Sequence, residues 1–362
     1  MHTRSRPRST RCAFGVALVT LVTLLAHLTA CDGGSPRRSP APAPPPPDRW
    51  VATRAEADAR LARLHAAEGM PGVQAAVYAG GGVVWQAARG TAKDGTAVTP
   101  TTPFPLASVS KVVTALLLGR LVARGDVGLD AAVSSYVPAW RDAGAATTVR
   151  QLAGHLGGVR HYMLSDLGRT KTYARLADAV TDIFASDARV AEPGERYAYS
   201  SWGYTLLGAV LESAANSSFL ELLDRELARP TGIALTGDPG ATGRWPAGGL
   251  LGSAVDVVRI GSLLLPDARF VPPEVLATML APQQTRAGVA TGVGLGWRVG
   301  ADAAGRRIAH HAGNMPDARS VVVVYLDLGV VVALMSNRQN SPEDVEAAAR
   351  ELAAPFLAVV AK

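Results

Sequence analysis

From residue 52 onward, apolar and polar positions alternate first with the periodicity of a helix and then with that of a β-strand. Residues 52–68 carry Ala and Leu at helical spacing with Arg and Asp between them, and Gly69 follows as a stop. Two β-like runs, 73–78 and 83–88, flank the Gly-rich residues 79–82, a pattern typical of a hairpin. The chain is therefore predicted to begin folding with a helix and two paired strands.

Helical spacing returns in the middle of the chain, and β-like runs return near its end. A helix is predicted over residues 108–123, with Gly125 as its stop. Further helices are predicted at 204–215, 219–228 and 254–264. Three β-like runs follow at 293–299, 320–325 and 330–335. Ser341-Pro342-Glu343-Asp344 then has the cap residue, the proline and the acids that open a last helix.

Strands at both ends with helices between them indicate an α/β (α+β) protein whose one sheet is built from both termini. We expect a sheet subdomain over about 50–125 and 285–362, split by a mostly helical subdomain over about 126–284. The 362 residues are 48% hydrophobic and 18% charged, which suffices for such a core and excludes wholesale disorder.

The first thirty residues have the layout of an export signal. Residues 1–11 are basic, residues 13–28 are mostly apolar, and small residues close the segment. Leu28-Thr29-Ala30-Cys31 resembles the lipobox of bacterial lipoproteins, which implies cleavage before Cys31 and a diacylglyceryl group on its sulfur. The other cysteine lies inside the signal, so the mature chain would hold no internal disulfide. The alternative is an ordinary signal peptide in which Cys31 occurs by chance.

A proline-rich tether over residues 31–49 is predicted to separate this signal from the folded domain at 50–362. Seven prolines fall between Pro36 and Pro47, a density that prevents helix and sheet and favours an extended chain. The protein would then be exported and attached to the bacterial cell envelope by lipid, on the periplasmic or extracytoplasmic face of a membrane.

The formal charge of +6 does not predict a nucleic-acid partner. Four arginines in the signal account for most of it, and without them 32 basic and 30 acidic side chains remain. No basic patch is left to explain, so nucleic acid is excluded as an expected partner.

Lysine is rare in this chain, which makes Lys111 a candidate catalytic residue. Four of the 36 basic residues are lysines, and a desolvated lysine, unlike arginine, can lose its proton and act as a base. Ser108 precedes Lys111 by three residues at the start of the predicted helix, so both side chains share one face. The same spacing also fits a capped helix with an exposed lysine, but apolar neighbours on both sides favour chemistry.

Three motifs in order resemble those of the serine β-lactamase, DD-peptidase and esterase superfamily, which includes the class C β-lactamases. They are Ser108-Val109-Ser110-Lys111, Tyr199-Ser200-Ser201 and His311-Ala312-Gly313. The resemblance covers about residues 71–337 and implies a β-lactamase/transpeptidase-like fold with an antiparallel sheet flanked by helices. Residues 148–152 and 160–162 look closest to the mitochondrial, serine β-lactamase-like branch of this superfamily.

The resemblance implies a serine hydrolase that works through an acyl-enzyme on an amide or ester bond. Ser108 would attack the carbonyl carbon, and Lys111 would help to take its proton. Tyr199 would relay protons, first to the leaving group and later from water. The backbone N–H groups of Ser108 and Asn314 would form the oxyanion hole, and neither a metal nor an organic cofactor is needed.

Ser201, His311 and Gly313 are expected to line the substrate site, and two of them depart from the family pattern. Ser201 replaces an asparagine, and His311 replaces a lysine that would hold a substrate carboxylate. Arg307 or Arg319 could restore that charge. These departures favour a small peptide or ester substrate over a β-lactam.

One alternative stays open beside the enzyme hypothesis, and a metal site is considered as well. The chain could be a penicillin-binding or peptidoglycan-sensing envelope protein with slow or no turnover. The histidines could also bind a metal, since His310 adjoins His311 and two more precede them, but no carboxylate or thiolate cluster accompanies them. We therefore expect no metal, with His155 as a loop-fixing residue and only one of the adjacent pair in the cleft.

The lipid anchor predicts that Cys31→Ser releases the protein from membranes, because the serine oxygen cannot replace the acylated sulfur. Fractionation of cells that express the variant would then show it in the soluble fraction. Equal membrane association of the variant and the parent chain would support the ordinary signal peptide instead.

Overall fold

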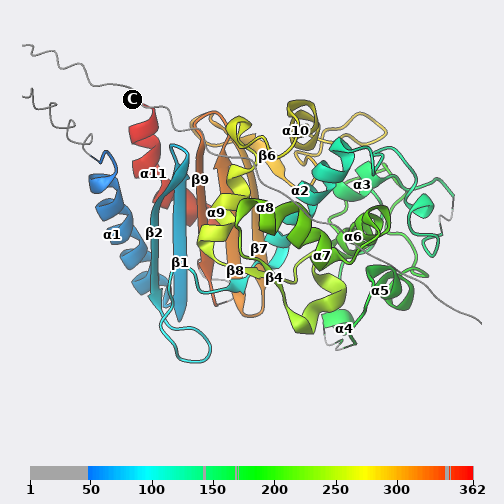
Figure 1. Ribbon diagram of the computed structural model, residues 1–362, viewed down its shortest axis with the longest axis horizontal. Coiled ribbons are helices and arrows are strands. Elements are labelled where there is room, and N and C mark those ends of the chain that lie inside the picture. Colours follow the sequence, from blue (N-terminus) through cyan, green and yellow to red (C-terminus); the bar gives the residue numbers. More distant parts are fainter. Residues whose placement is uncertain are drawn as a thin grey trace, which may run out of the picture. The chain divides into compact units, whose positions relative to one another are not determined.

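Six strands form one antiparallel sheet in the computed structural model, in the order β2-β1-β9-β8-β7-β6 (Figure 1). Their bounds are β1 Gly72–Ala79, β2 Gly82–Gly90, β6 Arg298–Ala301, β7 Arg307–Met315, β8 Ala318–Tyr325 and β9 Val330–Ser336. β1 pairs with β9 from Val73–Ser336 to Tyr78–Val331, so the two ends of the folded chain meet inside the sheet. The predicted fold class is confirmed.

The structure describes residues 48–361 apart from 142–143, 168, 170, 339–341 and 343. The predicted signal, Cys31 and nearly all of the tether lie outside the described residues. Within the described part, no single helix combines the length and the apolar content needed to cross a membrane. Among these residues, helix α6 (Ser201–Ala215) and the segment Phe219–Thr231 meet both criteria only when they are taken together, as a bent pair.

The sheet is covered on both faces, which explains why its central strands read as continuous apolar runs. Helices α1 (Val51–Glu68) and α11 (Val345–Val360) cover one face, and α9 (Ala254–Ser262) and α2 (Ser110–Ala123) lie on the other side (Figure 1). Along β8, residues 321 and 323 belong to the core under α1 and α11, and residues 322 and 324 to the opposite core. Side chains on both faces of β8 are therefore buried in apolar cores.

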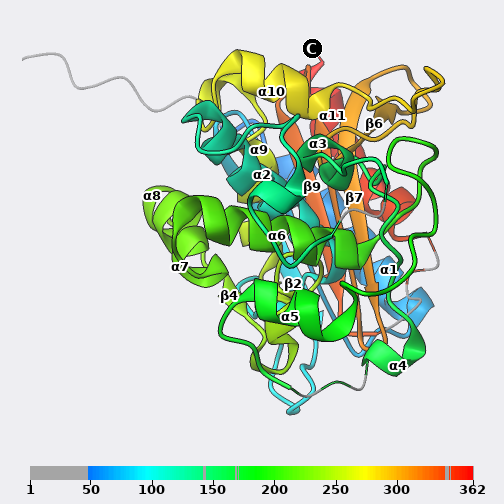
Figure 2. The ribbon, with the colours of Figure 1, turned by 90° about the vertical axis from the view of Figure 1, so that its right-hand side faces the viewer.

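Helices α2 and α6 (Ser201–Ala215) cross at the centre of the helical side, with the shorter elements around them (Figure 2). The shorter helices are α3 Val149–Ala153, α4 Leu164–Leu167, α5 Leu176–Ile183, α7 Phe219–Leu223, α8 Arg229–Thr231 and α10 Pro273–Leu280. A small second sheet has the order β3-β5-β4, with β3 Phe104–Pro105, β4 Thr236–Gly237 and β5 Leu250–Gly252. The subdomain boundaries stay a prediction, and α9 packs on the large sheet although it lies within residues 126–284.

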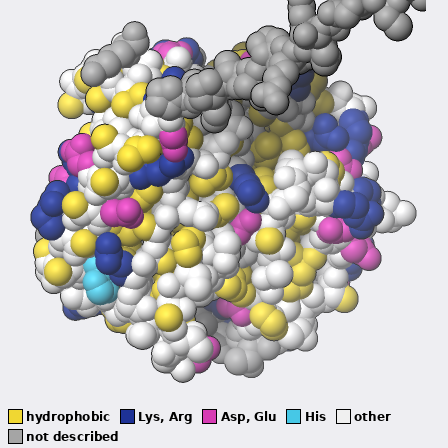
Figure 3. Space-filling model, turned by 60° about the vertical axis from the view of Figure 1, so that its left-hand side comes forward, with side chains coloured by type: hydrophobic (Ala, Val, Ile, Leu, Met, Phe, Trp, Pro, Cys, Tyr) yellow, Lys and Arg dark blue, Asp and Glu magenta, His cyan; other side chains and the backbone are white. Residues whose placement is uncertain are grey.

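On the face turned toward the viewer in Figure 3, basic and acidic side chains are intermingled and not gathered by sign. Arg60 and Glu56, one helical turn apart on α1, form an ion pair at 2.6 Å. Exposed pairs of this kind contribute about 0.3–0.5 kcal/mol each, so they add little to stability.

Three predicted elements differ from the observed ones. The run 293–299 is a strand only from Arg298, because β6 pairs with β7 there and the preceding residues turn back on themselves. The last helix begins at Val345, since the Asp344 carboxylate accepts the N–H groups of the first turn. The helix predicted at 219–228 ends at Leu223 and continues as a wider π-helical turn. The strand β7 was not among the predicted β-like runs.

Helix α6 comes so close to the loop containing Pro246 that only glycine fits at position 208. A Cβ on Gly208 would lie 2.3 Å from Pro246 Cγ and 2.7 Å from Leu176 Cδ1. The same loop is attached to α2, because Thr114 Oγ1 donates to the Pro246 carbonyl at 2.7 Å. The loop therefore fixes the spacing of the two central helices.

We predict that Gly208→Ala destabilises the protein by about 1–3 kcal/mol through overpacking. This outweighs the gain of about 1 kcal/mol that alanine brings inside a helix. Urea unfolding measures the difference. Gly300→Ala in β6, where a Cβ meets nothing within 4 Å, is the matched control and should leave the midpoint unchanged. Equal midpoints for both variants would contradict the close contact.

Candidate active site

Ser108 lies in a short 3₁₀ turn, Ala107–Val109, that leads directly into α2. The turn is strained, since Ala107 has φ of +45°, a region that non-glycine residues rarely adopt. Two bonds anchor it: the Leu106 N–H donates to the Leu250 carbonyl at 2.8 Å, and Ser320 Oγ donates to the Leu106 carbonyl at 2.6 Å. The serine is thus held rigidly between β5 and β8.

Lys111 lies one helical turn after Ser108 and is completely buried. Its Nζ donates to Ser108 Oγ at 3.3 Å, to Ser201 Oγ at 2.9 Å and to the Ala247 carbonyl at 2.6 Å. All three acceptors are uncharged, so the ammonium has hydrogen-bond partners but no counter-ion among them. Burial lowers the pKa of Lys111 below its ordinary 10.5, and the nearby Tyr199 only partly opposes this.

Tyr199 also contacts this serine, because its Oη donates to Ser108 Oγ at 2.9 Å. It directly precedes α6, whose cap residue Ser200 accepts the Gly203 N–H at 2.8 Å. Burial raises the pKa of Tyr199, but the positive charge of Lys111 and the contacts with Lys111 and Ser108 outweigh it, so the net pKa is lowered. The structure therefore brings together Ser108, Lys111 and Tyr199.

Two histidines hold the segment that carries Tyr199. The Ser200 N–H donates to Nδ1 of His155, and the Ser201 N–H donates to Nδ1 of His161, each at 3.1 Å. Both rings also lie against the Tyr199 ring, with centroids 4.5 and 5.3 Å away. Burial lowers the pKa of both histidines, and the charge of Lys111 adds to this, so both rings are neutral acceptors. His155 thus lies where a loop-fixing residue is expected.

His161 was not predicted as a site residue. No spacing rule connects position 161 with position 201, because their contact exists only after α6 is placed. Ser201 was expected to contact substrate, and the structure places its hydroxyl on Lys111 as well as on the wall of a cavity beside Ser108.

His311 points toward the cleft and His310 points away from it. On β7, the His310 ring lies 2.7 Å from the Glu346 carboxylate of α11, on the far face of the sheet. Burial, followed by the charge of Lys111, lowers the pKa of His311 to about 3, so this ring is neutral at physiological pH. β6 pairs with β7 only as far as His310, which leaves residues 311–315 without a β6 neighbour beside the cleft.

Gly313 allows β7 to approach the serine turn. A Cβ at this position would lie 2.6 Å from the Leu106 carbonyl oxygen and 2.9 Å from the Ala107 Cβ. Asn314 follows and lines the cavities on both sides of Ser108. The oxyanion hole formed by the N–H groups of Ser108 and Asn314 stays a prediction.

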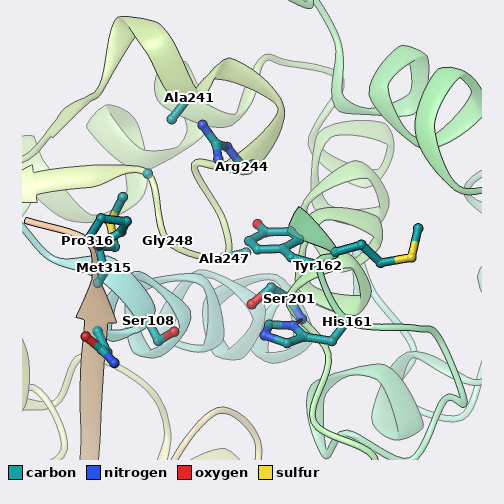
Figure 4. Close-up of a pocket in the computed structure, with 14 residues that line it drawn as sticks. Ser108, His161, Tyr162, Ser201, Ala241, Arg244, Ala247, Gly248, Met315 and Pro316 are labelled. Carbon is teal, nitrogen blue, oxygen red and sulfur yellow. Dashed lines mark hydrogen bonds between the residues drawn. The ribbon is translucent and has the colours of Figure 1, made fainter. Parts of the chain in front are cut away.

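Two cavities meet at Ser108. The first cavity, about 430 Å³, is bounded by Ser108, Met315 and Pro316 on one side and by His161, Tyr162 and Ser201 on the other, with Arg244 and Ala241 above them in Figure 4. The second cavity, about 350 Å³, is lined by Ser108, His161, Tyr199, Arg298, His311, Ala312, Gly313, Asn314 and Arg319. The site is therefore a cleft with Ser108, the predicted nucleophile, between two compartments.

Arginines supply positive charge to the second cavity. Arg307 and Arg319 were the two arginines expected to restore a positive charge near the substrate. Arg319 lines the second cavity, whereas Arg307 pairs with Asp327 at 3.1 Å and does not line this cavity. Arg298 also lines it and was not predicted, since its strand pairs with β7 only in the folded sheet. Within the described residues, no group of three or more His, Cys, Asp or Glu side chains is arranged to hold a metal ion.

A serine in hydrogen-bond contact with a buried lysine and a tyrosine, in a cleft beside a strand edge, is the arrangement expected of a serine hydrolase, the class to which this chain belongs. The family is shown by a match over residues 57–355 to the family model described as Beta-lactamase, and the chain is a member of that family.

Named relatives of this chain have several activities. It is 29% identical over 324 residues to penicillin-binding protein 4 of Amycolatopsis lactamdurans, covering 77% of this chain and 84% of the relative. It is 31% identical over 178 residues to esterase EstB of Burkholderia gladioli, covering 45% of each. The solved structure of SurE with D-Leu matches with a TM-score of 0.72 and 29% identity, covering 84% of this chain and 76% of the other.

Lys111→Arg is predicted to lower kcat/KM by about 10²–10⁴, the usual size of a proton-transfer contribution, because the guanidinium keeps its proton. In the parent enzyme the rate should rise with pH and level off below pH 10.5, since the lowered pKa of Lys111 gives the neutral amine there. The observed value belongs to the coupled Lys111–Tyr199 pair.

Lys171→Arg is the matched control, because this exposed lysine pairs with Asp182 at 3.1 Å and does not line either cavity. It should keep the parent rate and pH profile. Full activity of Lys111→Arg would exclude Lys111 as the base.

Proposed function

We propose that this enzyme hydrolyses an ester or amide bond of a small acyl substrate through an acyl-enzyme on Ser108. The observation that carries the proposal is the convergence of Lys111 Nζ and Tyr199 Oη on Ser108 Oγ, at 3.3 and 2.9 Å. Among the described residues, no carboxylate bonds to Lys111 or Tyr199 and fixes its proton, so protons can move within the group of three.

The reaction begins when Ser108 Oγ bonds to the substrate carbonyl carbon and its proton passes to the Lys111–Tyr199 pair. The bond to the leaving group then breaks, and Tyr199 donates a proton to that group. Water attacks the resulting ester on Ser108 and gives its proton to the same pair. Release of the acid returns the proton to Ser108 and restores the site.

The position of Tyr199 indicates which part of the substrate occupies each cavity. Tyr199 lines the second cavity and not the first, so the leaving group that it protonates occupies the second cavity. The acyl group then extends into the first cavity. Arg298 and Arg319 in the second cavity favour a leaving group that carries an anionic end, such as the terminal carboxylate of a peptide.

The neutral His311 offers no cation to a substrate carboxylate, so the carboxylate of a peptide leaving group would have to bind Arg298 or Arg319, whereas an ester without a carboxylate needs neither. The partial likeness to an esterase supports an ester substrate. A penicillin-binding role with slow deacylation is the second candidate, and the likeness to penicillin-binding protein 4 favours it.

We also propose that the chain is exported and anchored by lipid at Cys31. The proposal rests on the signal-like residues 1–30, the lipobox-like Leu28-Thr29-Ala30-Cys31 and the proline-rich segment behind them.

A panel of an aryl ester, a D-amino-acid peptide and a cephalosporin tests the proposed reaction, with mass spectrometry of trapped adducts. Turnover and an adduct on Ser108 are expected, both lost in Ser108→Ala.

Tyr199→Phe should lower kcat by about 10²–10⁴ because it removes the proton relay. Tyr173→Phe, on a tyrosine bonded to Asp182 at 2.6 Å and outside both cavities, should keep the parent rate. A lasting cephalosporin adduct without turnover of any substrate would favour the penicillin-binding role.

A further inference from the structure

Arg244 is a positively charged residue in the wall of the first cavity, where the proposed acyl group lies. Figure 4 shows it across the cavity from Ser108, above Tyr162. Among the described residues that line this cavity, there is no other Lys or Arg and no carboxylate. The charge of Arg244 therefore faces the space beside the nucleophile without an anion in the wall to neutralise it.

The guanidinium of Arg244 has few partners within the described residues. It donates to the Gly240 carbonyl at 3.4 Å, the long limit for a hydrogen bond, and no carboxylate forms an ion pair with it there. By contrast, Arg160 lies 2.6 Å from Asp166. A guanidinium has five N–H donors, so most of those on Arg244 are free to bind another group.

The surroundings of Arg244 strengthen its attraction for an anion. The other cavity walls are mostly apolar, with Ala241, Ala247, Met315 and Pro316 among them. Arg244 itself is half-buried, and charges interact more strongly where water is partly excluded. Paired with a carboxylate, a planar guanidinium can donate two parallel hydrogen bonds, which gives direction as well as attraction.

We propose that Arg244 determines acyl specificity by binding a carboxylate at the far end of the acyl group. The substrates are then half-esters or half-amides of dicarboxylic acids, including acyl groups that end in an acidic side chain. This inference rests on the proposed function, because it needs the acyl group to occupy the first cavity. It names the class of acyl group that the enzyme prefers, which the contacts among Ser108, Lys111 and Tyr199 do not determine.

Two 4-nitrophenyl esters with the same leaving group test this specificity: the adipate half-ester and the hexanoate ester. Their acyl chains have equal length and differ in the terminal carboxylate, and adipate is long enough to avoid rapid self-cleavage through a five- or six-membered anhydride. We expect the parent enzyme to prefer the adipate ester by about tenfold in kcat/KM, roughly the value of one partly exposed charge pair. The preference should fall as salt is added.

Arg244→Ala should lower this ratio to about one, and Arg244→Glu should bring it below one, because the substrate carboxylate then faces a like charge. Arg244→Lys should keep part of the preference, since it retains the charge but loses the planar fork. Arg259→Ala is the matched control: this exposed arginine of α9 lies outside both cavities, and its loss should leave the ratio unchanged.

A parent ratio near one at low salt would overturn the inference while leaving the proposed hydrolysis intact. A ratio that is unchanged in Arg244→Ala would also overturn it, by assigning the preference to another group. If neither ester is hydrolysed and no adduct forms on Ser108, the proposed function itself fails. The salt dependence of the substrate preference is measured on the parent enzyme alone, so this test can be made even if a variant folds poorly.

Discussion

The burial of the Lys111 amine with no carboxylate partner in the described part of the chain is the constraint on which this site depends. Lys111 Nζ has three hydrogens, and the structure provides three acceptors: Ser108 Oγ, Ser201 Oγ and the Ala247 carbonyl. Every acceptor is neutral, so the hydrogen bonds orient the amine but do not compensate for the loss of water around its charge. The pKa of Lys111 is lowered for this reason, which is the property that the proposed general base needs.

The three acceptors come from three separate elements, which explains why the central helices pack so closely. Ser108 comes from the turn before α2, Ser201 from the start of α6, and Ala247 from the loop that Thr114 and Gly208 fix from either side. A shift of any one element would leave a buried hydrogen without an acceptor, at a cost of about 1–3 kcal/mol. The packing of α2 against α6 is therefore part of the chemistry as well as of the core.

The spacing of apolar residues predicted the helices and strands in which that spacing is regular. It did not predict the strand and the site residues whose positions depend on contacts between distant segments. The helices at residues 51–68 and 110–123 and the first hairpin follow from spacing and stop residues. Strand β7 was missed because two histidines, a glycine and an asparagine interrupt its alternation, and it is a strand because β8 pairs along its whole length. Arg298 and Arg244 have no local signal, since their positions in the two cavities arise only when distant segments meet.

The same burial that lowers the pKa of Lys111 also reduces the stability of the fold. In the unfolded chain the amine binds a proton up to its ordinary pKa of 10.5, whereas the folded site releases that proton at lower pH. Between the lowered pKa and 10.5 the unfolded state holds more protons, so stability rises with pH across this interval and is least where the folded amine is charged. Adding a carboxylate beside Lys111 would remove this loss, but it would also raise the pKa of the amine and end its use as a base. The neutral acceptors around Lys111 are thus a compromise in which stability is given up for a proton that can move.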